Sequence, residues 1–374
     1  MNDKFWRGKI HGQRYTGLDS LRGLAAVQVT CHHIYLMFAD DAKSSGTSFV
    51  PGPVSFLAVG HPSVIYFFVI SGFVLTIFLQ NDQPPYVVYL IRRLCRIYLP
   101  FVVAVVVAAA LVHLLAAHPL SNYPRTAIEW TDARMATVAR HIILTGTNNN
   151  INLDDPIWSL VHELRISALM PMIVFTIEFQ PEIGAIFLIS LAVIGYCVLN
   201  SHGLGPFFIA APTVGSSLLM TVWYLAPFAI GSWVAARRST MIRLAEHHRT
   251  VACGLGLSAI AIYLVPMPGL VLDLGPALMG AAAVIAAIAL PSWQAVLEHK
   301  SLQWFGRISY SLYLTHSVVI LSVVNLLHAH FNRFWLAMLT AVLVLPIAQF
   351  AYLMVERPCH NLGRRLGRPF LRSA

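Results

Sequence analysis

Long apolar runs, separated by short polar segments, cover most of the chain. About ten of them are long enough to cross a bilayer as helices. They lie at residues 18–38, 62–80, 97–117, 156–178, 184–199, 208–236, 250–266, 271–291, 308–328 and 334–355. The sixth run is long, and the stretch from Pro206 to Pro212 predicts a broken or interfacial turn near its start. The pattern predicts an all-α fold, a polytopic helical bundle in a membrane.

Composition supports this prediction. The 374 residues are 57% hydrophobic and only 11% charged, which is typical of an integral membrane protein and excludes an ordinary soluble enzyme. No large polar region accompanies the apolar runs. We therefore expect one membrane domain over residues 1–358 and a basic cytoplasmic tail over residues 359–374.

The distribution of basic residues predicts the orientation of the bundle. If ten spans begin from a cytoplasmic N-terminus, most of the 25 Lys and Arg residues fall in cytoplasmic segments. Both termini are then cytoplasmic, and topology explains most of the +9 net charge without a nucleic-acid partner. The five cysteines are dispersed and show no CxxC spacing, so we expect neither a disulfide framework nor a metal site. In the predicted orientation, only five basic residues fall in segments on the non-cytoplasmic side: Lys43, Arg125, Arg134, Arg140 and Arg333.

Ionisable side chains inside the first apolar run, LRGLAAVQVTCHHIYLMF, need an explanation because lipid penalises them. Arg22 and His33 are eleven residues apart, about three helical turns, so they share a face about 16 Å apart along the axis. His32 lies about 80° away from that line. Such groups usually face the bundle interior or a water-filled cavity. A plainer alternative is an arginine that reaches the interface and a histidine that bonds to a neighbouring helix.

The fourth run, DDPIWSLVHELRISALMP, carries His162, Glu163 and Arg165 close together. In a helix, Glu163 shares a face with Ser159, while His162 shares one with Trp158. Adjacent faces of one helix then both carry polar groups, which favours a functional cavity beside it. The structural alternative is a buried ion pair, in which Glu163 only neutralises Arg165 or an arginine of the first run.

A basic segment, YLIRRLCRIYLP, precedes the third span and places Arg92, Arg93 and Arg96 at the expected cytoplasmic face. The general tendency of basic residues to lie on the cytoplasmic side of a membrane would by itself place these three arginines at that face. Three arginines also suit phosphate groups, which they bind through bidentate, charge-assisted hydrogen bonds.

Two other runs combine aromatic and small polar residues. HPSVIYFFVISGFVLTIF contains Phe68 and Ser71, and its Ser-Gly pair permits close helix packing or a local kink. GRISYSLYLTHS contains Tyr313 and His316, which are three residues apart and can line one cavity or merely cross-link helices.

Taken in order, these segments resemble the membrane-bound acyltransferase 3 family, which includes bacterial O-acetylases of surface polysaccharides. The similarity extends over nearly the whole chain. The chain departs from the common pattern at Ile65 and Tyr66, where an Asp often precedes the Phe pair, and at Leu164, where many members continue differently. The elements that carry the resemblance are Arg22 and His33 in LDSLRGLAAVQVTCHH, the segment FFVISGF, Arg93 and Arg96 in RLCRIYLP, Trp158, Ser159 and Glu163 in IWSLVHELRISALMP, the segment GRISYSLYLTH, and VERP at residues 355–358.

The resemblance implies an integral-membrane O-acyltransferase of the plasma (inner) membrane. Such an enzyme takes an acyl group, often acetyl, from acyl-CoA in the cytoplasm and transfers it to a hydroxyl of a carbohydrate acceptor, such as a surface or exported polysaccharide. Acetyl-CoA or another acyl-CoA is the implied donor substrate, without a metal.

The resemblance also implies roles for single residues. His33 would act as general base on the acceptor hydroxyl or as a transient acyl carrier. Arg22 would orient the donor or stabilise negative charge on the thioester oxygen. Glu163 would fix the tautomer of His33 or neutralise Arg22. The implied acyl-CoA-binding residues are Arg92, Arg93 and Arg96, and the implied cavity or substrate residues are Phe68, Ser71, Trp158, Ser159, His162, Tyr313 and His316.

Buried Arg, Glu and His residues also suit a second class of protein, a transporter or flippase of a polar or lipid-linked glycan. Transporters often show repeated halves with paired broken helices, and the sequence contains no such pairing. Within the enzyme class, the acceptor could instead be a small-molecule natural product or a lipid.

Overall fold

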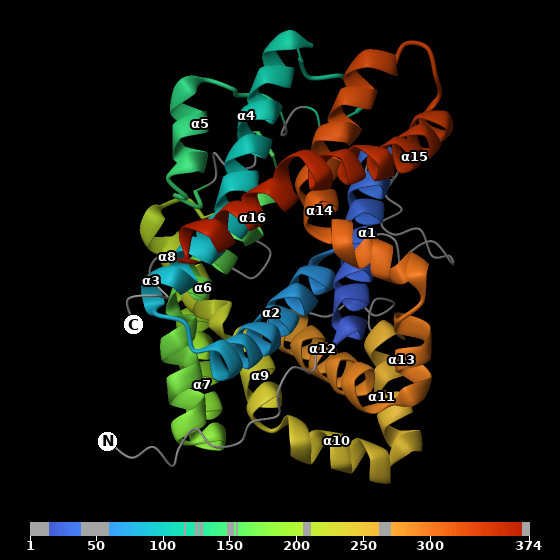
Figure 1. The fold of residues 1–374 in the computed structure, drawn as a ribbon. Helices are drawn as coiled ribbons and strands as arrows, with labels where there is room; N and C mark the ends of the chain where they lie inside the picture. The colour runs from blue at the N-terminus through green and yellow to red at the C-terminus, as the bar shows by residue number, and fades with distance from the viewer. Residues whose placement is uncertain are drawn as a thin grey trace.

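The computed structural model describes residues 15–38, 60–115, 117–123, 126, 130–147, 153–154, 156–204, 211–261 and 271–368. This part of the chain is helical, with β-bridges only as isolated pairs, so the predicted all-α fold is confirmed (Figure 1). The helices are α1 (Thr16–Phe38), α2 (His61–Asp82), α3 (Tyr86–Arg93), α4 (Leu99–Leu114), α5 (Met135–Ile142), α6 (Ile157–Phe179), α7 (Pro181–Ser201), α8 (Val214–Trp223), α9 (Leu225–Ala236), α10 (Arg238–His247), α11 (Arg249–Ala261), α12 (Val271–Ala289), α13 (Pro291–Leu297), α14 (Lys300–Leu327), α15 (Arg333–Ala351) and α16 (Arg357–Leu366), with π-helical turns η3 (Leu94–Tyr98) and η7 (Tyr352–Glu356).

Within the described residues, 7 helices are long and apolar enough to cross a membrane when directly continuous helices are taken together. An eighth span would be formed by α12 and α13, which meet at a bend of 95°. The chain is therefore a multi-pass integral membrane protein. The seven are His61–Asp82, Tyr86–Leu114, Ile157–Phe179, Pro181–Ser201, Val214–Ala236, Lys300–Leu327 and Arg333–Leu366.

When α12 with α13 is counted as the eighth span, two of the ten predicted spans are missing, for different reasons. α1 has 23 residues but carries Arg22, His32 and His33, which make it too polar. α11 has 13 described residues, and the predicted span 250–266 extends beyond them. The turn predicted around Pro206 to Pro212 also lies largely outside the described residues.

Each of the two π-helical turns ends two residues before a proline. Pro100 follows η3 at the start of α4, and Pro358 follows η7 at the start of α16. A proline inside a helix lacks an N–H group, and its ring clashes with the carbonyl four residues earlier. A locally widened turn accommodates this clash, and such turns frequently occur at functional sites. Here they carry two charged side chains, Arg96 in η3 and Glu356 in η7.

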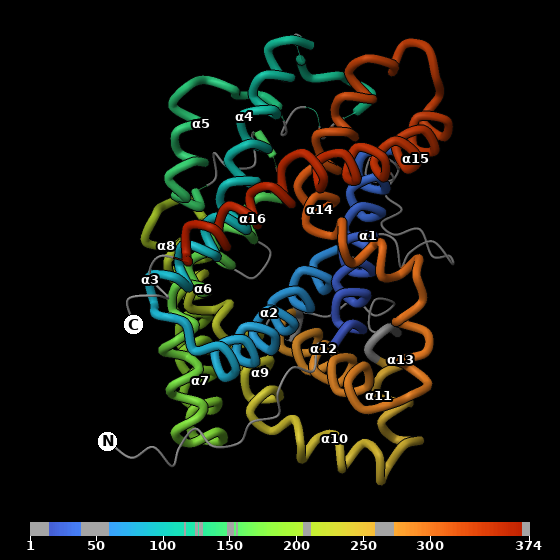
Figure 2. The backbone as a smooth tube through the Cα atoms, viewed as in Figure 1, coloured from blue at the N-terminus to red at the C-terminus, as the bar shows by residue number. Residues whose placement is uncertain are grey.

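The last helix continues into the predicted tail. α15, η7 and α16 follow one another without a loop, and Figures 1 and 2 show them crossing the bundle toward α3 and α4. Gly363 of α16 lies so close to η3 that an added Cβ would come within 2.8 Å of the Cβ of Cys95. The first part of the predicted basic tail is thus a helix packed on the membrane domain.

α1 and α14 run parallel, and two glycines fix their register. A Cβ added to Gly23 would lie 2.6 Å from the backbone nitrogen of Gly306, and one added to Gly306 would lie 2.5 Å from the carbonyl oxygen of Asp19. Only glycine permits backbones to approach this closely. At the far end of the same contact, the rings of His33 and His316 are 5.0 Å apart between centroids. The glycine contact therefore positions two histidines as well as Arg22.

We expect Gly306→Val to destabilise the protein by about 1–3 kcal/mol, because the new side chain forces α1 away from α14. Gly254→Val is the matched control, since a Cβ at Gly254 has no heavy atom within 4 Å. Thermal unfolding of both purified variants in detergent checks this. Equal apparent melting temperatures for the two variants would show that the helices do not depend on the glycine contact.

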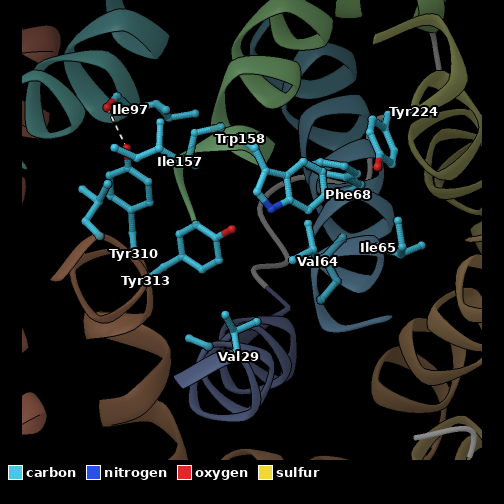
Figure 3. Packing of buried hydrophobic residues seen from close by; sticks show 14 of the residues in the cluster. Val29, Val64, Ile65, Phe68, Ile97, Ile157, Trp158, Tyr224, Tyr310 and Tyr313 are labelled. Carbon is cyan, nitrogen blue, oxygen red and sulfur yellow. Dashed lines mark hydrogen bonds between the residues drawn. The ribbon is translucent and has the colours of Figure 1, made fainter. Parts of the chain in front are cut away.

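Buried aromatic and aliphatic residues from α1, α2, α6, α9 and α14 form the core. Figure 3 shows Val29 of α1, Phe68 of α2, Trp158 of α6 and Tyr313 of α14 in one neighbourhood, and all four are buried. The outer surfaces of α6 and α7 instead expose large apolar side chains. This is the surface expected of helices that contact lipid. These side chains include Met172, Phe175, Phe179, Ile183, Ile186 and Phe187.

Candidate active site

A cavity of about 440 Å³ lies between α1, α2, α3, η3, α6, α14 and α16. It brings together six residues that the sequence singled out from four separate segments: Arg22, Ser71, Arg92, Arg93, Arg96 and Glu163. The same cavity is lined by Arg364 and His360 of α16 and by Asp82 at the end of α2. Five arginines therefore face two carboxylates in this cavity, which we call the donor cavity after its many hydrogen-bond donors.

A second cavity of about 460 Å³ adjoins the first and shares Arg22, Arg96, Tyr310 and His360 with it. This second cavity adds two arginines and two carboxylates, namely Arg307, Arg357, Asp19 and Glu356. The arginines outnumber the acids over both cavities together. The two cavities form a strongly cationic region inside a chain with few charges, which is the arrangement expected for a polyanionic ligand.

Several of these guanidinium groups retain unused donors. Among the described residues, the buried Nε atoms of Arg22, Arg92 and Arg93 have no hydrogen-bond partner. A buried donor without a partner costs free energy, so such groups usually belong to a site that a ligand or water completes. The three Nε atoms belong to the arginines that line the donor cavity.

Glu163 is held by two neighbours at the edge of the donor cavity. Ser71 Oγ donates to its Oε1 at 3.3 Å, and Arg93 Nη2 lies 3.4 Å from the same oxygen. Arg93 Nη2 also donates to Ser167 Oγ at 2.7 Å. The acid therefore pairs with Arg93 rather than with Arg165, and it fixes the guanidinium of Arg93 beside the cavity.

Arg165 has a different task on the other side of α6. Its guanidinium donates to Ser217 Oγ at 2.8 Å, Thr221 Oγ1 at 3.0 Å and the carbonyl oxygen of Leu144 at 2.7 Å. These bonds tie α6 to α8 and to the turn after α5. The charge of Arg165 is thus used to hold helices together, away from the donor cavity.

A small void of about 20 Å³ leads from Arg22 and Glu163 to Tyr313, between α2, α6 and α14. Its lining includes three predicted cavity residues, Phe68, Ser159 and Tyr313. Tyr313 donates its hydroxyl proton to the carbonyl oxygen of Pro156 at 2.8 Å, because a carbonyl can only accept, and Ser159 Oγ lies 2.7 Å from the same hydroxyl. At this volume the void holds about one water molecule, so it is a line of contact from Arg22 to Tyr313 with polar groups on one wall, which we call the passage and which must widen to admit a ligand.

The two histidines His33 and His316 lie beyond this passage. The ring of Tyr313 is 5.8 Å from that of His316, and the rings of His316 and His33 are 5.0 Å apart. His316 Nδ1 donates to the carbonyl oxygen of Leu312 at 3.1 Å, which leaves Nε2 as an acceptor. This Nε2 is buried and has no hydrogen-bond partner in the described part of the chain.

The predicted catalytic residues therefore occupy two places. Arg22 and Glu163 line the donor cavity, whereas His33 lies with His316 about 16 Å farther along α1. The contacts of Glu163 are with Ser71 and Arg93, so its expected effect on the His33 tautomer finds no support in this arrangement.

Trp158 and His162 lie on another face of α6. His162 Nδ1 is 2.9 Å from Thr221 Oγ1, and its ring is 5.1 Å from that of Tyr224. Trp158 is 5.6 Å from Tyr224 and is stacked on His61 at 5.8 Å. Both residues belong to the packed core between α6 and α8–α9, and neither lines the two cationic cavities or the passage.

Sequence reasoning missed the contribution of α16. Arg357, His360 and Arg364 are three and four residues apart, so they share one helix face, and all three line the cationic cavities. The spacing is visible in the sequence, but the tendency of basic residues to lie on the cytoplasmic side explains these residues equally well. It also missed His61 and Asp273, which contact one another through their side chains.

The chain matches one protein family over most of its length. The family model described as an acyltransferase domain, Acyl_transf_3, matches residues 15–353. Neither a curated protein nor a solved structure gives a significant match. The matched range includes the passage, His33 and the donor cavity except for His360 and Arg364, because it ends just before α16.

Proposed function

We propose a specific reaction for this chain, which belongs to the acyltransferase 3 family and is a membrane acyltransferase. It transfers an acyl group, in the first place acetyl, from acyl-CoA on the cytoplasmic side to a hydroxyl of a carbohydrate acceptor such as a surface or exported polysaccharide. The donor cavity with its unpaired arginine donors is the observation that carries this proposal.

The charge of the donor cavity supports CoA as the carrier of the acyl group. CoA is a polyanion, and its phosphates need several cationic donors in a confined space. Arg92, Arg93 and Arg96 provide them from α3 and η3, and Arg364 provides another from α16. Because most basic residues are expected on the cytoplasmic side, this cavity would open to the compartment that contains acyl-CoA.

The passage supports a path for the acyl group. The long pantetheine arm of CoA would extend from the arginines past Tyr313, toward His33 and His316. Arg22 lines both cationic cavities and the passage, so it lies where the thioester would enter. Its guanidinium would stabilise the negative charge that develops on the thioester oxygen when a nucleophile attacks, and this effect is strong in a site that excludes water.

His33 takes one of two roles in the transfer. As general base it accepts the proton of the acceptor hydroxyl while the oxygen bonds to the acyl carbon and the carbon–sulfur bond breaks. As carrier it bonds to the acyl carbon itself, releases the CoA thiolate and later gives the acyl group to the acceptor. A carrier would explain transfer across a bilayer that CoA does not cross.

Binding of acetyl-CoA tests the donor site without knowledge of the acceptor. Arg364→Ala is expected to weaken acetyl-CoA binding by about tenfold, since one charge-assisted hydrogen bond to a phosphate is lost. Arg365→Ala is the matched control, because the exposed Arg365 is the next residue of the same helix and lines neither cationic cavity.

Isothermal titration calorimetry on purified protein in lipid nanodiscs measures both affinities. If the two variants lose the same affinity, α16 contributes only general positive charge. If wild type does not bind acetyl-CoA at all, the proposed donor is wrong.

A further inference from the structure

A buried acid–histidine pair lies outside the cavities described above. His61 is the first residue of α2, and its Nε2 contacts Oδ1 of Asp273 at 2.5 Å. Trp223, the last residue of α8, donates a hydrogen bond through Nε1 to the other carboxylate oxygen of Asp273. Both oxygens of the acid are therefore occupied by donors from two other helices.

These contacts fix which ring nitrogen of His61 faces the acid. An ionised carboxylate only accepts hydrogen bonds, so a proton lies on Nε2, and in the neutral imidazole Nδ1 then carries the lone pair. No described residue forms a hydrogen bond with Nδ1. The side chain of Asp273 is 1% exposed, whereas that of His61 is 25% exposed. Solvent therefore reaches the histidine but not the acid.

Packing holds the imidazole in one orientation. Its ring is stacked on Trp158 at 5.8 Å with an angle of 9° between the planes. The residue before it, Gly60, lies against the ring of His32, since an added Cβ would come within 2.5 Å of His32 Cδ2. The first turn of α2 is thus fixed on both sides.

The pair lies at the same end of the bundle as His33. α2 runs antiparallel to α1, because Phe73 of α2 meets Tyr15 of α1 whereas Gly60 meets His32. A contact on α6 agrees with this level. Trp158, which stacks on His61, is followed by Ser159, and Ser159 contacts Tyr313 at the far end of the passage. His61 and His33 therefore lie at the same level, away from the arginines of the donor cavity.

A purely structural bridge does not account well for this geometry. Burying a carboxylate costs several kcal/mol, and an apolar contact would join α2, α8 and α12 at least as well. An acid that orients a histidine and fixes its tautomer is, in contrast, the usual partner of a general base.

We propose that His61 is a second acid–base residue, which contacts the acceptor hydroxyl while Asp273 and Trp223 act as positioning residues. This inference rests on the proposed function. Nδ1 of His61 accepts the hydroxyl proton as the acceptor oxygen bonds to the acyl carbon. The bond from that carbon to the ring nitrogen of His33, formed earlier when the CoA thiolate left, breaks in the same step. The proton then passes from His61 to the leaving group or to water.

This assignment separates the two halves of the reaction. The acceptor is activated at His61, so that His33 is available to receive the acyl group from CoA. The open choice between general base and carrier for His33 is then decided in favour of the carrier.

The test uses purified protein in lipid nanodiscs, acetyl-CoA labelled in the acetyl group, and a panel of methyl glycosides as probe acceptors, with hydrolysis to acetate measured alongside. His61→Gln is expected to bind acetyl-CoA as tightly as wild type but to form ester and acetate at least 10²-fold more slowly. Added imidazole is expected to restore part of the rate in His61→Ala. Asp273→Asn is expected to slow the reaction as well, because the amide favours the wrong tautomer.

His328→Ala is the control, since His328 is a half-buried histidine at the end of α14 whose Nδ1 donates to the carbonyl oxygen of Val324. It should react like wild type, with and without imidazole. The inference is overturned if wild type is active and the His61 variants react like wild type, lose acetyl-CoA binding, or lose activity that imidazole does not restore. The proposed function is left intact by these results. A wild type that releases no CoA removes both.

Discussion

His33→Ala is expected to abolish acyl transfer while the protein still folds and inserts. A side chain that acts as base or carrier contributes typically 10²–10⁴-fold to the rate, and no neighbour on α1 can replace it on the same face. His33 is only half-buried, so its removal leaves no large cavity. Ester formation from labelled acetyl-CoA, at matched protein amount and melting temperature, measures the loss.

Tyr35→Phe is a useful control for this variant. Tyr35 is two residues away on α1, is similarly half-buried and lies on a different face of the helix. It should retain most of the activity. Full transfer by His33→Ala would remove His33 from the mechanism and leave the donor cavity to be explained in another way.

Arg22→Gln is expected to lower kcat by about 10²–10³-fold, with a smaller change in the affinity for acetyl-CoA. This is the effect of removing one donor that stabilises a developing oxyanion. Arg22 lines both cationic cavities and the passage, so its charge lies between the other arginines of the donor cavity and His33.

Arg307→Gln separates this role from general electrostatic attraction. Arg307 lines only the second cationic cavity, on the same helix as Tyr310. Its variant should change KM for acetyl-CoA slightly and leave kcat unchanged. If Arg22→Gln raises KM and spares kcat, Arg22 binds the donor but does not stabilise the transition state.

Local patterns were sufficient to predict the helices and part of the site. The spacing of Arg22 and His33 on one helix face follows from helix geometry alone, and the structure places both toward the bundle interior. The clustering of Arg93 with Glu163 required tertiary contacts, because these residues are separated by 70 positions. The sequence offered Arg165 as a nearer partner, but the α8 backbone and hydroxyls take up that guanidinium.

The same reason explains what sequence reasoning missed. His61 and Asp273 are 212 residues apart, and neither belongs to a recognisable motif. Arg364 could have been found from its helical spacing with His360, but only the close contact of Gly363 with η3 turns that face toward the cavity. Trp158 and His162 share the helix of Glu163, yet their faces pack on Tyr224 instead of the cavity.

The number of spans was predicted less well than their positions. Each of the seven apolar helices overlaps one predicted range, although Tyr86–Leu114 begins well before its range and Arg333–Leu366 ends well after. α1 shows that a buried helix of the bundle can be too polar to satisfy a test of composition. Its arginine and histidines face other helices rather than lipid, which is where the cost of burying them is smallest.

The central claim is that this chain transfers an acyl group from CoA to a hydroxyl. The most direct test follows free CoA thiol and acetyl ester in sealed vesicles that contain wild-type protein, labelled acetyl-CoA and the methyl glycosides. The account predicts that thiol equals the sum of ester, acetate and protein-bound acetyl, and that ester appears only when an acceptor is present. Movement of a glycoside across the vesicle membrane, without thiol release and without ester, would contradict it and identify a transporter.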